Sequence, residues 1–195
     1  SKGGQFEILK YLFQDADEID SSNYEHSFII ACGSGRLEIV KYLFDLGKEK
    51  EKCIDIHADN ELAFRLASIS NNIEIVKYLI ELGKEEALHN GKRINIHVEG
   101  EYAFYWAYAC NNLEMVKYLI ELGKEERKWI NIHARNELAF RFACQNNFLD
   151  LVKYLIQVGE EYGDRIKIHI QDKIVFKNAI DNKNYDLLKY LLFLF

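Results

Sequence analysis

The sequence predicts an all-α solenoid, in which a short helical unit recurs along one chain. Residues 54–83, 94–123 and 130–159 can be aligned residue by residue, and all three contain the block Val-Lys-Tyr-Leu-Ile. One histidine position marks the period, with steps of 40, 36 and 36 residues at His57, His97, His133 and His169. A two-helix unit cannot bury its own apolar face, so identical units are expected to stack side by side.

We predict a single repeat domain over residues 1–195. Its parts are a half repeat at 1–18, repeats at about 19–53, 54–93, 94–129 and 130–165, and a C-terminal capping repeat at 166–195. The capping repeat carries Asn178 where earlier copies have large apolar residues, as suits an outer face. The half repeat keeps only the second-helix sequence, so the chain is either a fragment or uses that helix as its cap.

Each copy is expected to run finger, helix, turn, helix, loop. The finger is Ile-x-Ile-His, whose alternation suits a short extended segment. Good N-cap residues open the predicted first helix at Asn60, Gly100, Asn136 and Asp172. The glutamate that follows three of them places negative charge at the positive end of the helix dipole.

The second half of each copy follows from glycine, asparagine and apolar spacing. Asn71-Asn72, Asn146-Asn147 and Gly33-Ser34-Gly35 tolerate left-handed backbone angles and predict the turn. An apolar stripe at helical spacing predicts the second helix. The helix is expected to end at a left-handed residue, namely Gly47, Gly83, Gly123 and Gly159. The insertion at 88–91, which makes the 40-residue step, is expected to be a loop.

Positions that do not vary between copies are expected to form the stacking core. One such position holds Phe28, Phe64, Phe104, Phe140 and Phe176. Another holds Ala31, Ala67, Ala107, Ala143 and Ala179, where neighbouring helices approach too closely for a larger side chain.

Composition excludes several functional classes. The chain is 49% apolar and 29% charged, which argues against disorder, and its net charge of −6 makes nucleic acid a poor partner. No apolar run approaches the roughly 20 residues that span a bilayer, and the first residues show no signal peptide. The four cysteines form no Cys-x-x-Cys pair, so reduced thiols are expected. We therefore expect a soluble, intracellular and cytoplasmic protein.

The repeated block resembles the ankyrin repeat. The resemblance rests on Leu37-Glu38-Ile39-Val40-Lys41-Tyr42-Leu43, its copies at Ile73, Leu113 and Leu149, and the glycine after each. The pattern departs from the family in its period of 36 instead of about 33, and in Leu62-Ala63-Phe64-Arg65 where Thr-Pro-Leu-His is usual. This proline-free style is similar to ankyrin proteins of mimivirus-like giant DNA viruses. A tetratricopeptide array, of period about 34, is the alternative fold, but its aromatic-glycine pattern is absent.

No motif for catalysis, metal binding or cofactor binding is found. Equivalent histidines in a stack lie roughly 8–10 Å apart, whereas zinc–nitrogen bonds are about 2 Å, so hydrogen bonding between neighbouring fingers is the preferred role. No nucleophile elbow or phosphate loop is present. We therefore expect no enzyme, no cofactor and no metal. The lysine column at Lys41, Lys77, Lys117 and Lys153 is expected to be an exposed row, with the neighbouring tyrosines packing.

Residues that vary between otherwise identical copies are the candidate site, because stacking does not determine them. The candidates are Asp59, Arg65, Ile69, Glu99, Tyr105, Tyr108, Arg135, Arg141 and Gln145. The ankyrin resemblance implies that fingers and first helices line a concave binding face, and tyrosine and arginine are enriched in interface hot spots. The alternative is an ordinary solvated surface.

These observations predict a monomeric, non-catalytic scaffold that binds another protein, a host protein if the source is viral. The alternative is the substrate-recognition part of a larger adaptor, for example one that recruits a ubiquitin ligase.

Overall fold

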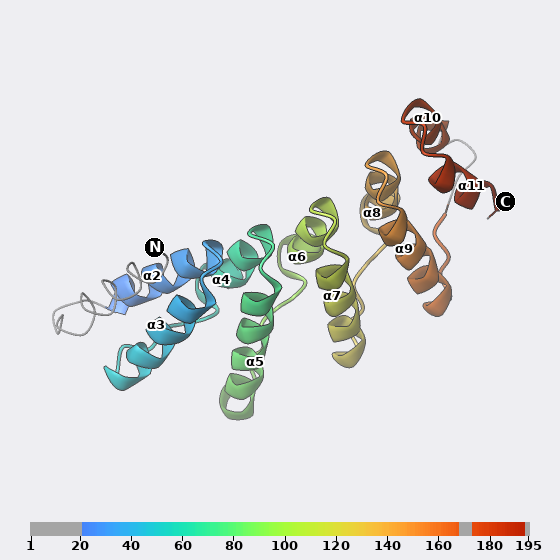
Figure 1. Ribbon diagram of the computed structural model, residues 1–195. Helices are drawn as coiled ribbons and strands as arrows, with labels where there is room; N and C mark the ends of the chain where they lie inside the picture. Colours follow the sequence, from blue (N-terminus) through green and yellow to red (C-terminus); the bar gives the residue numbers. More distant parts are fainter. Residues whose placement is uncertain (1–20, 168–172, 194–195) are drawn as a thin grey trace. The chain divides into compact units, whose positions relative to one another are not determined.

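The computed structural model describes residues 21–167 and 173–193, which form ten helices and no strand. Figure 1 labels these helices along the chain. The chain divides into two units, Ser1–Val98 and Glu99–Phe195. The all-α repeat architecture predicted from the sequence is confirmed. The half repeat at 1–18, His169 and Asp172 lie outside the described residues.

The first unit contains two helix pairs. They are α2 (Ser21–Gly33) with α3 (Leu37–Glu49), and α4 (Ala58–Ile69) with α5 (Ile73–Asn90). Helix α2 contacts both α3 and α4, and α4 contacts α5, so each pair packs on the next. The first helices lie side by side, and so do the second helices.

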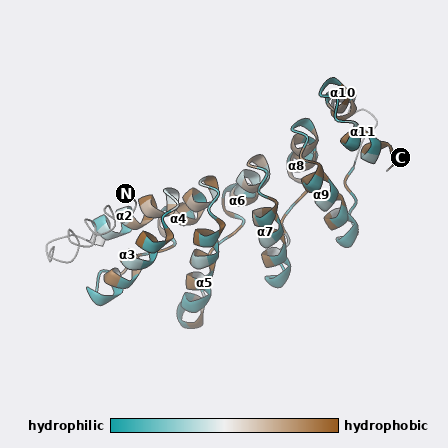
Figure 2. Cartoon of the chain, in the orientation of Figure 1, coloured by the Kyte–Doolittle hydropathy of each residue, from teal (hydrophilic) through white to brown (hydrophobic). Residues whose placement is uncertain are grey.

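The second unit repeats this arrangement with three pairs. They are α6 (Val98–Ala109) with α7 (Leu113–Glu125), α8 (Ala134–Gln145) with α9 (Leu149–Glu161), and α10 (Lys173–Asp181) with α11 (Tyr185–Phe193). Helix α8 contacts both α9 and α10. Hydrophobic and hydrophilic positions alternate along the second helices, as one buried stripe requires (Figure 2).

The turn between the paired helices is held by asparagine. Asn71 and Asn111 have φ of 58° and 54°, in the left-handed region that asparagine tolerates. The next residue caps the second helix, because the Asn72 side chain accepts the Ile75 N–H at 3.2 Å and Asn112 accepts the Met115 N–H at 2.9 Å. The predicted turns are confirmed.

The stacking core lies where the unchanging positions predicted it. Four matched phenylalanines are at most 2% exposed, namely Phe28, Phe64, Phe104 and Phe140. The matched alanines are at most 5% exposed, and Phe176 is half-buried. Full burial of one phenylalanine side chain contributes about 1.5–3 kcal/mol, so this row alone is a large share of the stability.

The glycines after the Val-Lys-Tyr-Leu block do not end the second helices, so that prediction is wrong. Gly47, Gly83, Gly123 and Gly159 lie inside the helices and are buried. A Cβ at Gly123 would lie 2.9 Å from the Lys128 carbonyl oxygen, and the other three meet equally close atoms. Glycine is needed because the chain turns back against its own helix. The left-handed residues come later, at Glu51, Gly91, Arg127 and Gly163.

The four-residue insertion is helical, and not the loop that was predicted. Helix α5 has 18 residues where α3, α7 and α9 have 13, and Gly91 ends it with φ of 74°. The insertion therefore extends α5 by more than one helical turn of 3.6 residues. The added turn lies beyond the buried part of the helix, because Leu88, His89 and Asn90 are exposed.

The last helix pair has a mixed surface. Asn182 and Lys183 are exposed, as expected for a cap, but Ile180, Leu192 and Phe193 are exposed too, at 57%, 61% and 85%. The capping role of residues 166–195 and the single-domain organisation stay predictions. Within the described residues, no helix combines the length and hydropathy that crossing a membrane requires.

Candidate functional site: left-handed turns and an aromatic pocket on the first helices

Each of three first helices opens with a left-handed turn of three residues. These turns are Asp59-Asn60-Glu61, Glu99-Gly100-Glu101 and Arg135-Asn136-Glu137, with φ between 49° and 69°. The predicted N-cap residues Asn60, Gly100 and Asn136 are therefore the middle residues of these turns, and that assignment is corrected. Non-glycine residues in this region cost roughly 1 kcal/mol or more each, so neighbouring contacts must hold them.

A buried glutamate supplies part of that support. The Glu137 carboxylate lies 2.9 Å from His133 Nδ1 through both oxygens and accepts the Lys167 N–H at 3.2 Å. Glu61 repeats this with His57 Nδ1 at 3.0 and 3.1 Å and the Asn95 N–H at 3.2 Å. Because an ionised carboxylate only accepts, Nδ1 carries the proton. We call this arrangement the glutamate clasp.

The clasp joins one copy to the finger of the next. Glu25 accepts the Asp55 N–H and Glu101 accepts the Asn131 N–H, both at 3.3 Å. The histidine was predicted to bond between neighbouring fingers, but Nδ1 of His57 and of His133 bonds the glutamate of its own copy. The glutamate makes the link to the next finger. The repeated His-x-x-x-Glu spacing could have revealed this pair.

Carboxylates also face the other ring nitrogen. His57 Nε2 lies 3.6 Å from Glu86, and His133 Nε2 lies 3.5 Å from Asp164. Among the described residues, no three or more histidine, cysteine, aspartate or glutamate side chains form a group that could hold a metal ion. None of the four cysteines, all of which lie in the described part of the chain, forms a disulfide, and Cys32 and Cys144 are buried.

Two candidate arginines brace their own left-handed turns. Arg65 Nη2 donates to the Asp59 carbonyl at 3.1 Å, and Arg141 Nη2 donates to the Arg135 carbonyl at 3.4 Å. The copy between them has Tyr105 in place of the arginine and Gly100 in place of asparagine. Glycine adopts φ of 65° without steric cost, so this turn forms without an arginine brace.

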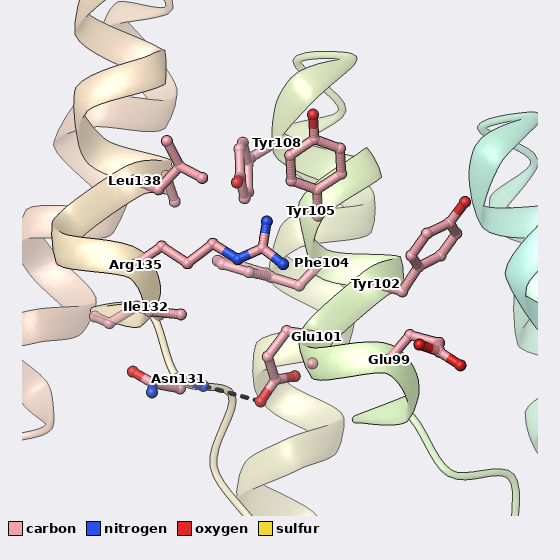
Figure 3. Close-up of a pocket in the computed structure, with 13 residues that line it drawn as sticks. Glu99, Glu101, Tyr102, Phe104, Tyr105, Tyr108, Asn131, Ile132, Arg135 and Leu138 are labelled. Carbon is pink, nitrogen blue, oxygen red and sulfur yellow. Dashed lines mark hydrogen bonds between the residues drawn. The ribbon is translucent and has the colours of Figure 1, made fainter.

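Next to Tyr105, which stands where the neighbouring copies have arginine, the second unit has a pocket of about 150 Å³ between α6 and α8 (Figure 3). The pocket brings together the candidates Glu99, Tyr105, Tyr108 and Arg135. Phe104, Ile132 and Leu138 add apolar walls. Gln145 is exposed but does not line the pocket. In the first unit Asp59 is exposed and Ile69 is half-buried.

The aromatic walls hold one another in place. The Tyr108 ring lies edge-on to Tyr105 at 5.3 Å and to Phe104 at 5.5 Å between centroids. Tyr108 is only 4% exposed, and burial raises its pKa to about 12. Tyr108 is therefore a neutral wall of the pocket, and the half-buried Tyr105 is the more accessible ring.

Arg135 is the exposed cation at the pocket. Its guanidinium forms neither a hydrogen bond nor an ion pair with any other described residue. Figure 3 shows it extending toward Tyr105 and Phe104, while Glu99 points away on the other side of the turn. The Glu101 carboxylate below is bonded to the Asn131 N–H. The pocket thus combines apolar walls with an arginine that forms no ion pair, and the carboxylates of Glu99 and Glu101 also belong to its lining.

The second helices carry a different pattern. Lys41 lies over the Tyr78 ring at 5.8 Å, Lys117 over Tyr154 at 5.3 Å, and Lys153 over Tyr190 at 5.7 Å. Three lysines of the column are exposed and Lys77 is half-buried, close to the expected row. Each of the three contacts joins a lysine to the next copy, which gives the lysine–tyrosine column a stacking role.

The family comparison agrees with this architecture. The family model described as ankyrin repeats (3 copies) matches residues 1–90 and 85–172. The chain belongs to the ankyrin repeat family. Ankyrin repeats generally mediate protein–protein interaction and are typically non-catalytic. A search of the curated proteins gives no match.

Proposed function

We propose that this ankyrin repeat chain is a non-catalytic scaffold that binds a partner protein through its first-helix face. We define this face as residues 59–69 in the first unit and 99–109 with 134–145 in the second. One observation carries the proposal. Exposed residues on this face differ from copy to copy, whereas the buried core residues of the copies are the same. Stacking explains the constant residues, and it does not explain the varying ones.

The chemistry of the face supports recognition of a protein. Tyr105 and Arg135 are of the residue types enriched in binding hot spots, and they border a concave, largely apolar pocket. A partner side chain that fills such a pocket loses its contact with water, which stabilises the complex. Arg65 and Arg141, which brace the turns, support the face more than they contact the partner.

The test is to select binders and map where they bind. Protein fragments displayed on phage are selected on the chain, and their affinities are measured for Tyr105→Ala combined with Arg135→Ala, the two residues that border the pocket. We expect about a tenfold or larger loss of affinity, since hot-spot side chains contribute about 2 kcal/mol or more. The matched control is Lys117→Ala combined with Lys153→Ala on the second helices. Binders that ignore the first pair and respond to the second would refute the proposal.

We further propose that the chain comes from a mimivirus-like giant virus, binds a host protein as a monomer and acts in the host cytoplasm. Support comes from the sequence alone, through the recurring Val-Lys-Tyr-Leu block and the absence of proline. Light scattering of the purified chain tests the monomer, and the flanking genes test the source. A dimer mass or cellular neighbouring genes would contradict these two points.

A further inference from the structure

We propose that the pocket between α6 and α8 takes an aromatic side chain from a partner segment that also carries a carboxylate, which pairs with Arg135. This inference rests on the proposed protein-binding function and gives the partner its chemistry. The segment is expected to hold its aspartate or glutamate within a few residues of the aromatic ring.

The size and walls of the pocket favour one ring. The volume is about 150 Å³, and an apolar cavity of about that size accepts benzene. Phe104, Tyr105 and Tyr108 already meet at ring distances of 5.3–5.5 Å with planes 70–74° apart. An incoming ring can continue this edge-to-face arrangement, which adds about 0.5–1.5 kcal/mol to the burial of its surface.

The charge at the pocket favours a carboxylate beside that ring. The Arg135 guanidinium is exposed and forms no hydrogen bond or ion pair with a described residue, so pairing with a carboxylate requires no existing bond to break. Its fork of donors matches the two oxygens of a carboxylate. Glu101 is already bonded to the Asn131 N–H and Glu99 points away, so a lysine from the partner is the less favoured occupant (Figure 3).

The charge of Arg135 can be reversed without disturbing the turn. The same turn position holds Asp59 and Glu99 in the two preceding copies, and both have left-handed φ, at 49° and 53°. The Arg135 backbone carbonyl, which receives the Arg141 bond, is unaffected by its side chain. Arg135→Glu is therefore compatible with the fold, as its melting temperature will show.

The experiment uses a phage library of random twelve-residue peptides, selected on the whole chain. Enriched peptides are expected to contain an aromatic residue with a nearby aspartate or glutamate. One such peptide is then synthesised with a fluorophore, together with a version in which the acid is replaced by lysine. Fluorescence anisotropy gives the Kd of both peptides for the parent chain, Arg135→Glu and the control Lys128→Glu, which makes the same charge change at an exposed lysine outside the pocket.

The parent and the Lys128→Glu control are expected to bind the acidic peptide about tenfold more tightly than the lysine peptide. A tenfold difference in Kd corresponds to about 1.4 kcal/mol, the size expected for one charge-assisted pair. Arg135→Glu is expected to prefer the lysine peptide. Selection of basic peptides, no enrichment of aromatic residues, or an unchanged order in Arg135→Glu would overturn the inference. If Tyr105→Ala still weakened those peptides, the proposed function would stand. Peptides insensitive to every first-helix substitution would count against both.

Discussion

The glutamate clasp gives the sharpest test of how the copies are joined. Glu137 is 5% exposed and its carboxylate receives His133 Nδ1–H and the Lys167 N–H. In Glu137→Ala, both donors lose a charged acceptor, and each such bond contributes about 1.5–3 kcal/mol. Because the His133 side chain is 20% exposed and the Lys167 backbone can meet water, the lower end applies. We expect the free energy of unfolding to fall by about 2–4 kcal/mol.

Urea unfolding at pH 7, followed by circular dichroism at 222 nm, measures this change. Glu137→Gln keeps the shape and one acceptor, so it is expected to lose about half as much. The control is Glu125→Gln, an exposed glutamate of the same unit that forms no hydrogen bond with a described residue. A loss below about 0.5 kcal/mol in Glu137→Ala, or an equal loss in Glu125→Gln, would show that the clasp does not hold the stack.

Three further substitutions test the packing and the pocket. Gly123→Ala is expected to destabilise the chain by about 1–3 kcal/mol, since its Cβ would lie 2.9 Å from the Lys128 carbonyl oxygen; a gain in urea midpoint, as alanine usually gives inside a helix, would contradict the close approach. Ala107→Leu, at a position 1% exposed, is expected to cost about 1–3 kcal/mol by overpacking, and an unchanged melting temperature would count against the seam. For Tyr108, absorbance at 295 nm compared with Tyr108→Phe is expected to show ionisation at about 12 in the folded chain. Because this pKa is raised above about 10, the stability it contributes is present below pH 10 and lost as pH rises toward 12, and ionisation near 10 would show an open site.

The sequence predicted the parts of the fold that depend on simple periodicity. The phenylalanine and alanine rows were placed correctly because identical buried positions must meet their neighbours, and the asparagine turns because few residues tolerate left-handed angles. The two errors in the second helix have a common cause. A glycine can mark either a left-handed helix end or a close backbone approach, and only contacts such as those of Gly123 show which applies. Because the helix was expected to end at the glycine, the residues of the insertion that follow it were expected to form a loop.

The site was predictable in its positions and not in its interactions. Variation between copies identified Tyr105 and Arg135, which the structure places at one pocket. It gave no sign that Arg65 and Arg141 point back to their own turns, because an exposed position looks the same in either case. The paired change to Gly100 and Tyr105 in one copy was the available signal. A turn with glycine at its centre needs no arginine brace, so the two changes are expected to occur together.

Hydrogen–deuterium exchange on the chain with and without a selected peptide tests the central claim most directly. If varying residues bind and constant residues stack, exchange will slow at residues 99–109 and 131–142, where the pocket lies, and will stay unchanged in α7 and α9. Slower exchange confined to α7 and α9 would contradict the claim, because the partner would then rest on the helices that the copies share.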